Sequence, residues 1–236
     1  MVSDRGRYTG GGHNVLRYVI IFHLVVSLFA SPAFASNDLS DILDGIQNKY
    51  GHLPGLSVTY SREVITRSMS MLGGQVKGDL ATGRIYFKPS HYMRLEQETP
   101  RSETIIYNGD TLWWYIPDKK CVYKYPAQQF GQELRFLSNV FGGLGKVAEG
   151  FKVSIIDQKD TGEFLVKLRP DPSWENIDYM VLTLTSSNDI QGVDIHNQLG
   201  SITRFKLEKL TPKEKFEKGF FQFVVPKDVQ LVEQGM

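Results

Sequence analysis

A block of short, turn-punctuated segments in the middle of the chain limits the fold more than any other feature. Residues 83–117 include the runs GRIYFKP, YMRLE and NGDTLWWYIP. Pro89 can end a strand ladder but cannot lie inside one, because it has no N–H to donate. Asn108-Gly109 is a pair that accepts positive φ, as a type I′ hairpin turn requires. The block therefore predicts consecutive antiparallel strands.

One amphipathic helix is predicted before these strands. Between Leu39 and Tyr50 the apolar residues recur with the i, i+3, i+4, i+7, i+11 spacing of a single helix face. From Leu56 the period changes to two, which is typical of a half-buried strand. The polar stretch that contains Gly73-Gly74 and Gly78 fits a strand pair or a loop equally well.

The second half of the chain predicts a further helical region and then more strands. Residues 128–151 have apolar residues at helical spacing, so we expect one helix and a second, short one, separated at Gly142-Gly143. Strands are expected at 153–156, 164–168, 180–185, 190–195, 201–207 and 221–225. The pattern predicts a mainly β (α+β) fold in which helices pack on one face of a strongly curved or barrel-like antiparallel sheet.

The first 35 residues have the features of a secretory signal peptide. Three arginines precede an apolar run from Tyr18 to Ala30, and residues 31–35 end in a small-x-small motif. We expect cleavage before Ser36, export to the periplasm, and a single mature domain at 36–236. A lipid-anchored protein would have Cys at the cleavage point, and the apolar run is shorter than the roughly 20 residues that span a bilayer.

The charge of the mature chain argues against nucleic acid as a partner. The full chain has 27 basic and 26 acidic residues, and the signal removes three and one of these, so the mature chain is close to neutral. Phosphate binding requires a clear basic excess. The single cysteine, Cys121, cannot form an internal disulfide.

No catalytic or metal-binding motif is apparent. The mature histidines are His52, His91 and His196, and they share no metal-ligand spacing with one another or with Cys121. The glycine-rich run at 142–147 lacks the first glycine and the closing Ser or Thr of a phosphate-binding loop. We therefore expect no metal, no cofactor and no enzyme activity.

The order of these features resembles the LolA family, the periplasmic carriers of lipoproteins to the outer membrane. The matching pieces are Gly83 with its apolar strand, Lys88-Pro89, the run 108–117, and the C-terminal runs 200–205 and 221–229. The resemblance implies an incomplete antiparallel β-barrel of about ten to eleven strands, with a helical lid over its open, concave face. Acyl chains of a lipoprotein would enter the apolar cavity between lid and sheet.

The resemblance also implies partners and site residues. An inner-membrane ABC complex would hand acylated lipoproteins to this chain, a monomer, and an outer-membrane receptor would take them. Lys88 matches a position where the family commonly has an arginine that latches the lid, and lysine lacks the planar fork of arginine. The lid candidates are Leu39, Ile42, Leu43, Ile46, Leu134, Leu137 and Phe141.

Strand parity leaves two possibilities for the cavity wall. One side has Tyr86 and Trp114 with an inward-facing Lys88, and the other, more apolar side has Ile85, Phe87 and Trp113. The family analogy favours Tyr86, and hydrophobicity favours the other side. The predicted wall residues are Val58, Tyr60, Tyr86, Met93, Leu95 and Trp114.

Two other functions fit the same residues. A half-barrel of this kind can bind free lipid or glycolipid, or sense envelope stress through a lipid, since methylenes on a lipid and on a lipoprotein are alike. A secreted hydrolase would need a nucleophile or a carboxylate pair in the cavity.

Overall fold

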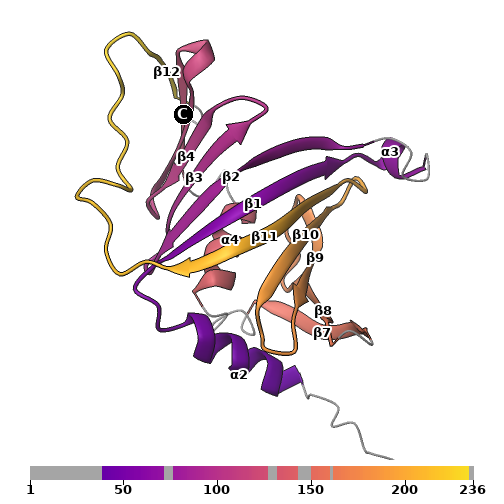
Figure 1. The fold of residues 1–236 in the computed structure, drawn as a ribbon. Helices are drawn as coiled ribbons and strands as arrows, with labels where there is room; N and C mark the ends of the chain where they lie inside the picture. The colour runs from indigo at the N-terminus through magenta and orange to yellow at the C-terminus, as the bar shows by residue number, and fades with distance from the viewer. Residues whose placement is uncertain (1–38, 72–76, 127–131, 143–149, 160–161, 234–236) are drawn as a thin grey trace, which may run out of the picture. The chain divides into compact units, whose positions relative to one another are not determined.

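The computed structural model describes residues 39–71, 77–126, 132–142, 150–159 and 162–233, with the side chains of 132–135 excepted. The described residues form one open sheet of twelve strands, in the order β12-β6-β5-β4-β3-β2-β1-β11-β10-β9-β8-β7 (Figure 1). All neighbouring strands are antiparallel except β12 and β6, which are parallel. The predicted mainly β fold, an incomplete antiparallel barrel with helices on one face, is confirmed, with twelve strands in place of ten to eleven.

The elements follow the sequence in a simple order. Helices α2 (Leu39–Tyr50) and α3 (Arg67–Met71) lie on either side of β1 (Leu56–Ile65) in the chain, and helix α4 (Gln132–Phe141) separates the two runs of strands. The first run is β2 (Asp79–Lys88), β3 (Tyr92–Thr99), β4 (Glu103–Tyr107), β5 (Thr111–Ile116), the 3₁₀ turn η2 (Pro117–Lys119) and β6 (Cys121–Pro126). The second run is β7 (Phe151–Gln158), β8 (Phe164–Pro170), β9 (Ile177–Leu184), β10 (Ile190–Asn197), β11 (Ile202–Pro212) and β12 (Gln230–Glu233).

Alternation along the strands creates the core. On β2 the residues Ala81, Ile85 and Phe87 are buried, and the register pairs Phe87 with Met93 on β3. Successive side chains of a strand point to opposite faces, so these buried residues share one face. We call this face, which packs against α2 and α4, the inner face of the sheet. Figure 1 shows α4 behind β1 and β11, and α2 at the lower end of the same strands.

The predicted hairpin turn lies one residue further along the chain. The backbone of Asn108 pairs with Thr111 through a 3.3 Å N–H to carbonyl hydrogen bond, so the two turn residues are Gly109 and Asp110. Only Gly109 has positive φ, at 96°. The Asn108 side chain caps the turn by accepting hydrogen bonds from the N–H groups of Asp110 and Thr111, at 3.1 and 2.9 Å. The predicted type I′ turn at Asn108-Gly109 was therefore wrong. Asn108 precedes the turn and accepts hydrogen bonds with its side chain, and Gly109 alone of the two turn residues has positive φ.

The predicted strand at 221–225 was also wrong. This segment makes no strand pairing and belongs to a stretch, residues 213–229, that we call the strap. Its phenylalanines pack on the outer face of the sheet: Phe221 lies 5.8 Å from the ring of Tyr92, and Phe223 lies 5.5 Å from that of Trp113. The alternating pattern therefore reflects aromatic packing, and the strand that follows it is β12.

The second, short helix expected after Gly142 falls outside the described residues, as does the predicted signal peptide. Among the described residues, no helix combines the length and the apolar character that crossing a membrane requires.

Candidate functional site

The candidate site is the apolar interior between the inner face and the two helices. Ile42 and Ile46 of α2 and Leu137 and Phe141 of α4 are all buried in the same cluster as the inner-face residues of the strands. Leu39 and Leu43 are partly buried against it. The side chain of Leu134 lies outside the described residues. The structure thus brings six of the seven predicted lid residues into one interior.

Helix α2 is joined to the turn between β9 and β10 by a few polar contacts. The Lys49 amine lies 2.6 Å from the Asp189 carboxylate and donates to the Ser187 carbonyl at 3.0 Å. The Tyr50 hydroxyl accepts a 3.2 Å hydrogen bond from the N–H of Ile190. The ion pair is more than a third exposed, and pairs of this kind contribute about 0–1 kcal/mol. The apolar face of α2 therefore provides most of its attachment.

Phe141 is the residue at which the helices and the sheet meet. Its ring centroid lies 4.5 Å from that of Phe87 on β2 and 6.2 Å from that of Tyr50 at the end of α2. Only 3% of its surface is exposed. Aromatic pairs at such distances contribute about 0.5–1.5 kcal/mol beyond the apolar area that they bury. Phe141 therefore links α4 to both α2 and β2.

Most predicted wall residues lie on the inner face. Val58, Tyr60, Met93 and Leu95 are buried there, and Trp114 is partly buried against the same cluster.

Tyr86 was placed on the wrong face. Its ring packs on the outer face, 5.0 Å from Phe220 and 6.4 Å from Phe216 of the strap. Ile85 and Phe87 occupy the inner face instead, because burying the two more apolar residues is favourable and the strap supplies aromatic partners for Tyr86.

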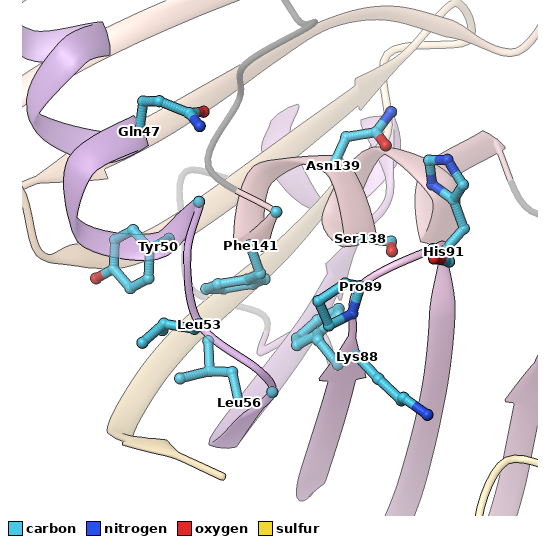
Figure 2. A pocket seen from close by; sticks show the side chains of 15 residues that line it. Gln47, Tyr50, Leu53, Leu56, Lys88, Pro89, His91, Ser138, Asn139 and Phe141 are labelled. Atoms are coloured by element: carbon cyan, nitrogen blue, oxygen red, sulfur yellow. The ribbon is translucent and has the colours of Figure 1, made fainter. Parts of the chain in front are cut away.

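Lys88 lies at the end of β2 and is exposed. Its amine is 5.6 Å from the centre of the Tyr92 ring. Within the described part of the chain, it donates no hydrogen bond to a carbonyl of α2 or α4, and Figure 2 shows it directed away from Ser138 and Asn139. Its role as a latch stays a prediction.

A pocket of about 460 Å³ lies where the ends of α2 and α4 meet the turn between β2 and β3 (Figure 2). Leu53, Phe87 and Phe141 contribute apolar surface. The turn residues Ser90 and His91 reach its rim from backbone conformations with φ of 72° and 66°. The polar side chains that line the pocket are those of Gln47, Tyr50, Lys88, Ser90, His91, Ser138 and Asn139, with no carboxylate among the described lining residues.

A catalytic or metal-binding arrangement is not evident in the described part of the chain. No group of three or more His, Cys, Asp or Glu residues is placed there to hold a metal ion. His196 stacks on Tyr179 at 4.2 Å on a different part of the sheet from His91, and burial lowers the pKa of its imidazole.

The fold and the sequence identify the family. The family described as "Outer membrane lipoprotein carrier protein LolA" matches residues 73–224, which is more than half of the chain. The chain belongs to this family.

Individual relatives agree with this assignment at low identity. The outer-membrane lipoprotein carrier protein of Legionella pneumophila (strain Corby) is 24% identical over 217 residues, covering 91% of this chain and 98% of the relative. That of Vibrio cholerae serotype O1 (strain ATCC 39541 / Classical Ogawa 395 / O395) is 24% identical over 192 residues, covering 81% and 89%. An uncharacterized conserved protein from Thermus thermophilus has the same fold, with a TM-score of 0.51, 12% identity, and coverage of 83% of this chain and 98% of that one.

Sequence reasoning missed several features of the LolA-type interior. It passed over Phe136 and Val140, which α4 also buries, although both share a helix face with Leu137 and Phe141. The outer aromatic surface under the strap was missed because its partners are more than a hundred residues apart. A polar cluster around Tyr60 and Arg62 was missed as well, because each residue alone fits an ordinary strand.

Proposed function

We propose that this protein is a periplasmic carrier that takes up the acyl chains of lipoproteins and delivers them to the outer membrane. The observation that carries the proposal is the burial of Ile42, Ile46, Leu137 and Phe141 from two helices inside one open sheet. Family membership supports the same reading. The proposal involves no catalytic step.

The energetics fit a carrier that must also release its cargo. Burying one methylene contributes about 0.8 kcal/mol, and burying one large apolar side chain about 1.5–3 kcal/mol. Four helix side chains that return to the interior therefore offset the burial of roughly 8–15 methylenes, which is of the order of one acyl chain. The free energies of the empty, closed carrier and of the loaded carrier are then similar, so a receptor with modestly higher affinity can take the cargo.

The pocket at the ends of α2 and α4 supports an entry route. It opens beside Phe141 and Phe87, where the lid residues meet the sheet, and its mixed polar and apolar lining suits a chain that enters from water. In this proposal Lys88 acts at the rim, and movement of α2 and α4 widens the pocket into the interior.

The finer parts of the proposal concern location and partners. Residues 1–35 act as an export signal that is removed before Ser36, and the mature chain works as a monomer. An inner-membrane ABC complex supplies acylated lipoproteins, and an outer-membrane receptor accepts them.

A release assay tests the function directly. Mature protein is added to spheroplasts whose labelled lipoproteins remain in the inner membrane, and the soluble fraction is analysed for complexes. We expect intact lipoprotein in a one-to-one complex with the carrier. Spheroplasts that release no lipoprotein to this protein would reject the proposal.

A second candidate is a carrier or sensor of free lipid. Lys88 and His91 line a pocket without a carboxylate among its described lining residues, which suits an anionic head group. Mass spectrometry of ligands that co-purify from the periplasm distinguishes the two functions, since only this candidate predicts phospholipid or glycolipid without lipoprotein.

A further inference from the structure

One polar cluster interrupts the apolar inner face. Tyr60 and Arg62 follow Leu56 and Val58 on the inward side of β1, and Gln97 on β3 pairs in register with Glu103 on β4. Trp114 joins the cluster from β5. Tyr60 is only 2% exposed, so water has little access to its hydroxyl. The cluster lies within the interior that we propose to hold acyl chains.

Part of this cluster is internally hydrogen-bonded. Gln97 accepts from Arg62 Nη2 at 3.3 Å and donates to the Arg101 carbonyl at 3.0 Å. The indole N–H of Trp114 donates to Glu103 at 2.9 Å. These bonds leave two buried atoms that have no hydrogen-bond partner in the described part of the chain: the Tyr60 hydroxyl oxygen and Arg62 Nε.

Buried polar atoms without a protein partner are rare in folded proteins, and they mark strain, a buried water or a site for another bound group. Burial raises the pKa of Tyr60 to about 12, so its hydroxyl keeps its proton at neutral pH and can donate. Arg62 Nε–H can only donate. Residues two apart on a strand point to the same side, so both donors face the same region of the interior. The site therefore calls for a buried acceptor.

The charge of the cluster selects the kind of acceptor. The Arg62 guanidinium and the Glu103 carboxylate lie on the same inner face, where their charges roughly cancel. An added carboxylate or phosphate would carry an unbalanced charge into a buried region, which is costly. A neutral carbonyl oxygen accepts two hydrogen bonds without that cost. Ester and amide carbonyls are the neutral acceptors that every acyl chain carries at its head.

We propose that Tyr60 and Arg62 donate hydrogen bonds to an ester or amide carbonyl of an acyl group held in the interior. The inference rests on the proposed carrier function and deepens it. Apolar walls bind methylenes whatever they are attached to, whereas these donors recognise the linkage itself. They fix how deep a chain enters and distinguish acylated ligands from plain hydrocarbon. The linkage occurs both in acylated lipoproteins and in free phospholipids.

The test compares ester ligands with ether ligands of equal chain length. A synthetic diacylated lipopeptide and its dialkyl ether analogue differ in the carbonyl oxygens, and phosphatidylglycerol with ester or ether chains provides the same comparison on a lipid head. Affinities for mature full-length protein are measured by calorimetry. We expect the wild type to prefer ester over ether by about two- to tenfold, the contribution of an ordinary hydrogen bond.

Tyr60→Phe is the decisive variant, because stability and binding should move in opposite directions. Removing an unpartnered hydroxyl removes its desolvation penalty, so the Tm of the empty protein should rise by about 2–4 °C. The preference for the ester should shrink, because Arg62 Nε is then the one proposed donor that remains, and the affinity for the ether should stay unchanged. Tyr115→Phe, on the outer face against Phe223, is the matched control and should change neither quantity.

The binding results distinguish the carbonyl site from the proposed carrier function. An ester preference as large in Tyr60→Phe as in the wild type, or an equal loss of affinity for ester and ether, would overturn the carbonyl site while leaving the carrier function standing. A wild type that binds neither ester nor ether would overturn both. If Tyr60→Phe reduces the ester preference for the lipopeptide alone, the site is supported and assigned to lipoproteins. If it reduces the preference for the phospholipid alone, the site is supported and assigned to free lipid.

Discussion

Truncating Phe141 to alanine should make the protein less stable and yet bind cargo more tightly. Phe141 is 3% exposed, and its ring contacts Phe87 and Tyr50, so the closed arrangement of the helices depends on it. Replacing a buried Phe by Ala costs about 3–5 kcal/mol. If the helices compete with cargo for the interior, a less stable closed state shifts the equilibrium toward the state that holds cargo.

The gain in cargo affinity depends on how much of this loss of stability falls on lid closure and how much on the rest of the fold. Each 1.4 kcal/mol that falls on the closed lid tightens cargo binding tenfold. If about 1.4–2.8 kcal/mol of the loss is specific to lid closure, affinity for a diacylated lipopeptide rises about 10- to 100-fold. Transfer to receptor-bearing membranes should slow accordingly, because release then lacks the returning side chain.

Calorimetric titration gives the affinity, and thermal unfolding gives the stability. Phe164→Ala on β8 is the matched control, since Phe164 is also 3% exposed but lies on a strand. We expect the control to lose similar stability without any gain in affinity. If Phe141→Ala binds the lipopeptide no more tightly than Phe164→Ala does, competition between lid and cargo is refuted.

Three further predictions concern single residues. Lys88→Leu should leave uptake intact and weaken release, and normal transfer to receptor-bearing membranes would reject its latch role. Gly45→Ala should raise the Tm by less than the roughly 1 kcal/mol that alanine gains over glycine in a helix, because the new Cβ must displace the Asn188 side chain. The same change made in an Asn188→Gly background should give the full gain, and an equal gain in both backgrounds would count against this contact. Burial lowers the pKa of His196 in the folded protein, so the neutral imidazole is favoured by folding. Its contribution to the free energy of unfolding should be complete above about pH 6.5, the value in the unfolded chain, and should be lost as the pH falls below it. His196→Gln should reduce the pH dependence of unfolding between pH 7 and 5, and an unchanged pH dependence would contradict the assignment.

The sequence predicted elements whose pattern is local. Helix α2 spans the predicted residues because one face repeats at helical spacing and the helix ends before Gly51. Strands β2 to β5 alternate and are joined by recognisable turns. The family resemblance then supplied the incomplete barrel, which pattern alone left as a curved sheet.

The errors arose where distant segments decide between local alternatives. The face of Tyr86 depends on phenylalanines of the strap, which lie well over a hundred residues later in the chain. The segment at 221–225 alternates like a strand, but it lies on a sheet face whose aromatic side chains bind it without any ladder. The unpartnered donors at Tyr60 and Arg62 become visible only when the five strands β1 to β5 are placed beside one another.

The position of β1 in the sheet bears on how the chain folds. β1 joins two groups of strands, because it pairs with β2 on one side and with β11 on the other. The second pairing aligns Leu56 with Pro212, so the seam at the centre of the sheet closes only when most of the chain is present. Contacts between residues this far apart slow folding and leave strand edges exposed meanwhile. A chain that is made N-terminus first therefore holds β1 with one edge open until β11 has been made, and during that interval the open edge can pair with other chains.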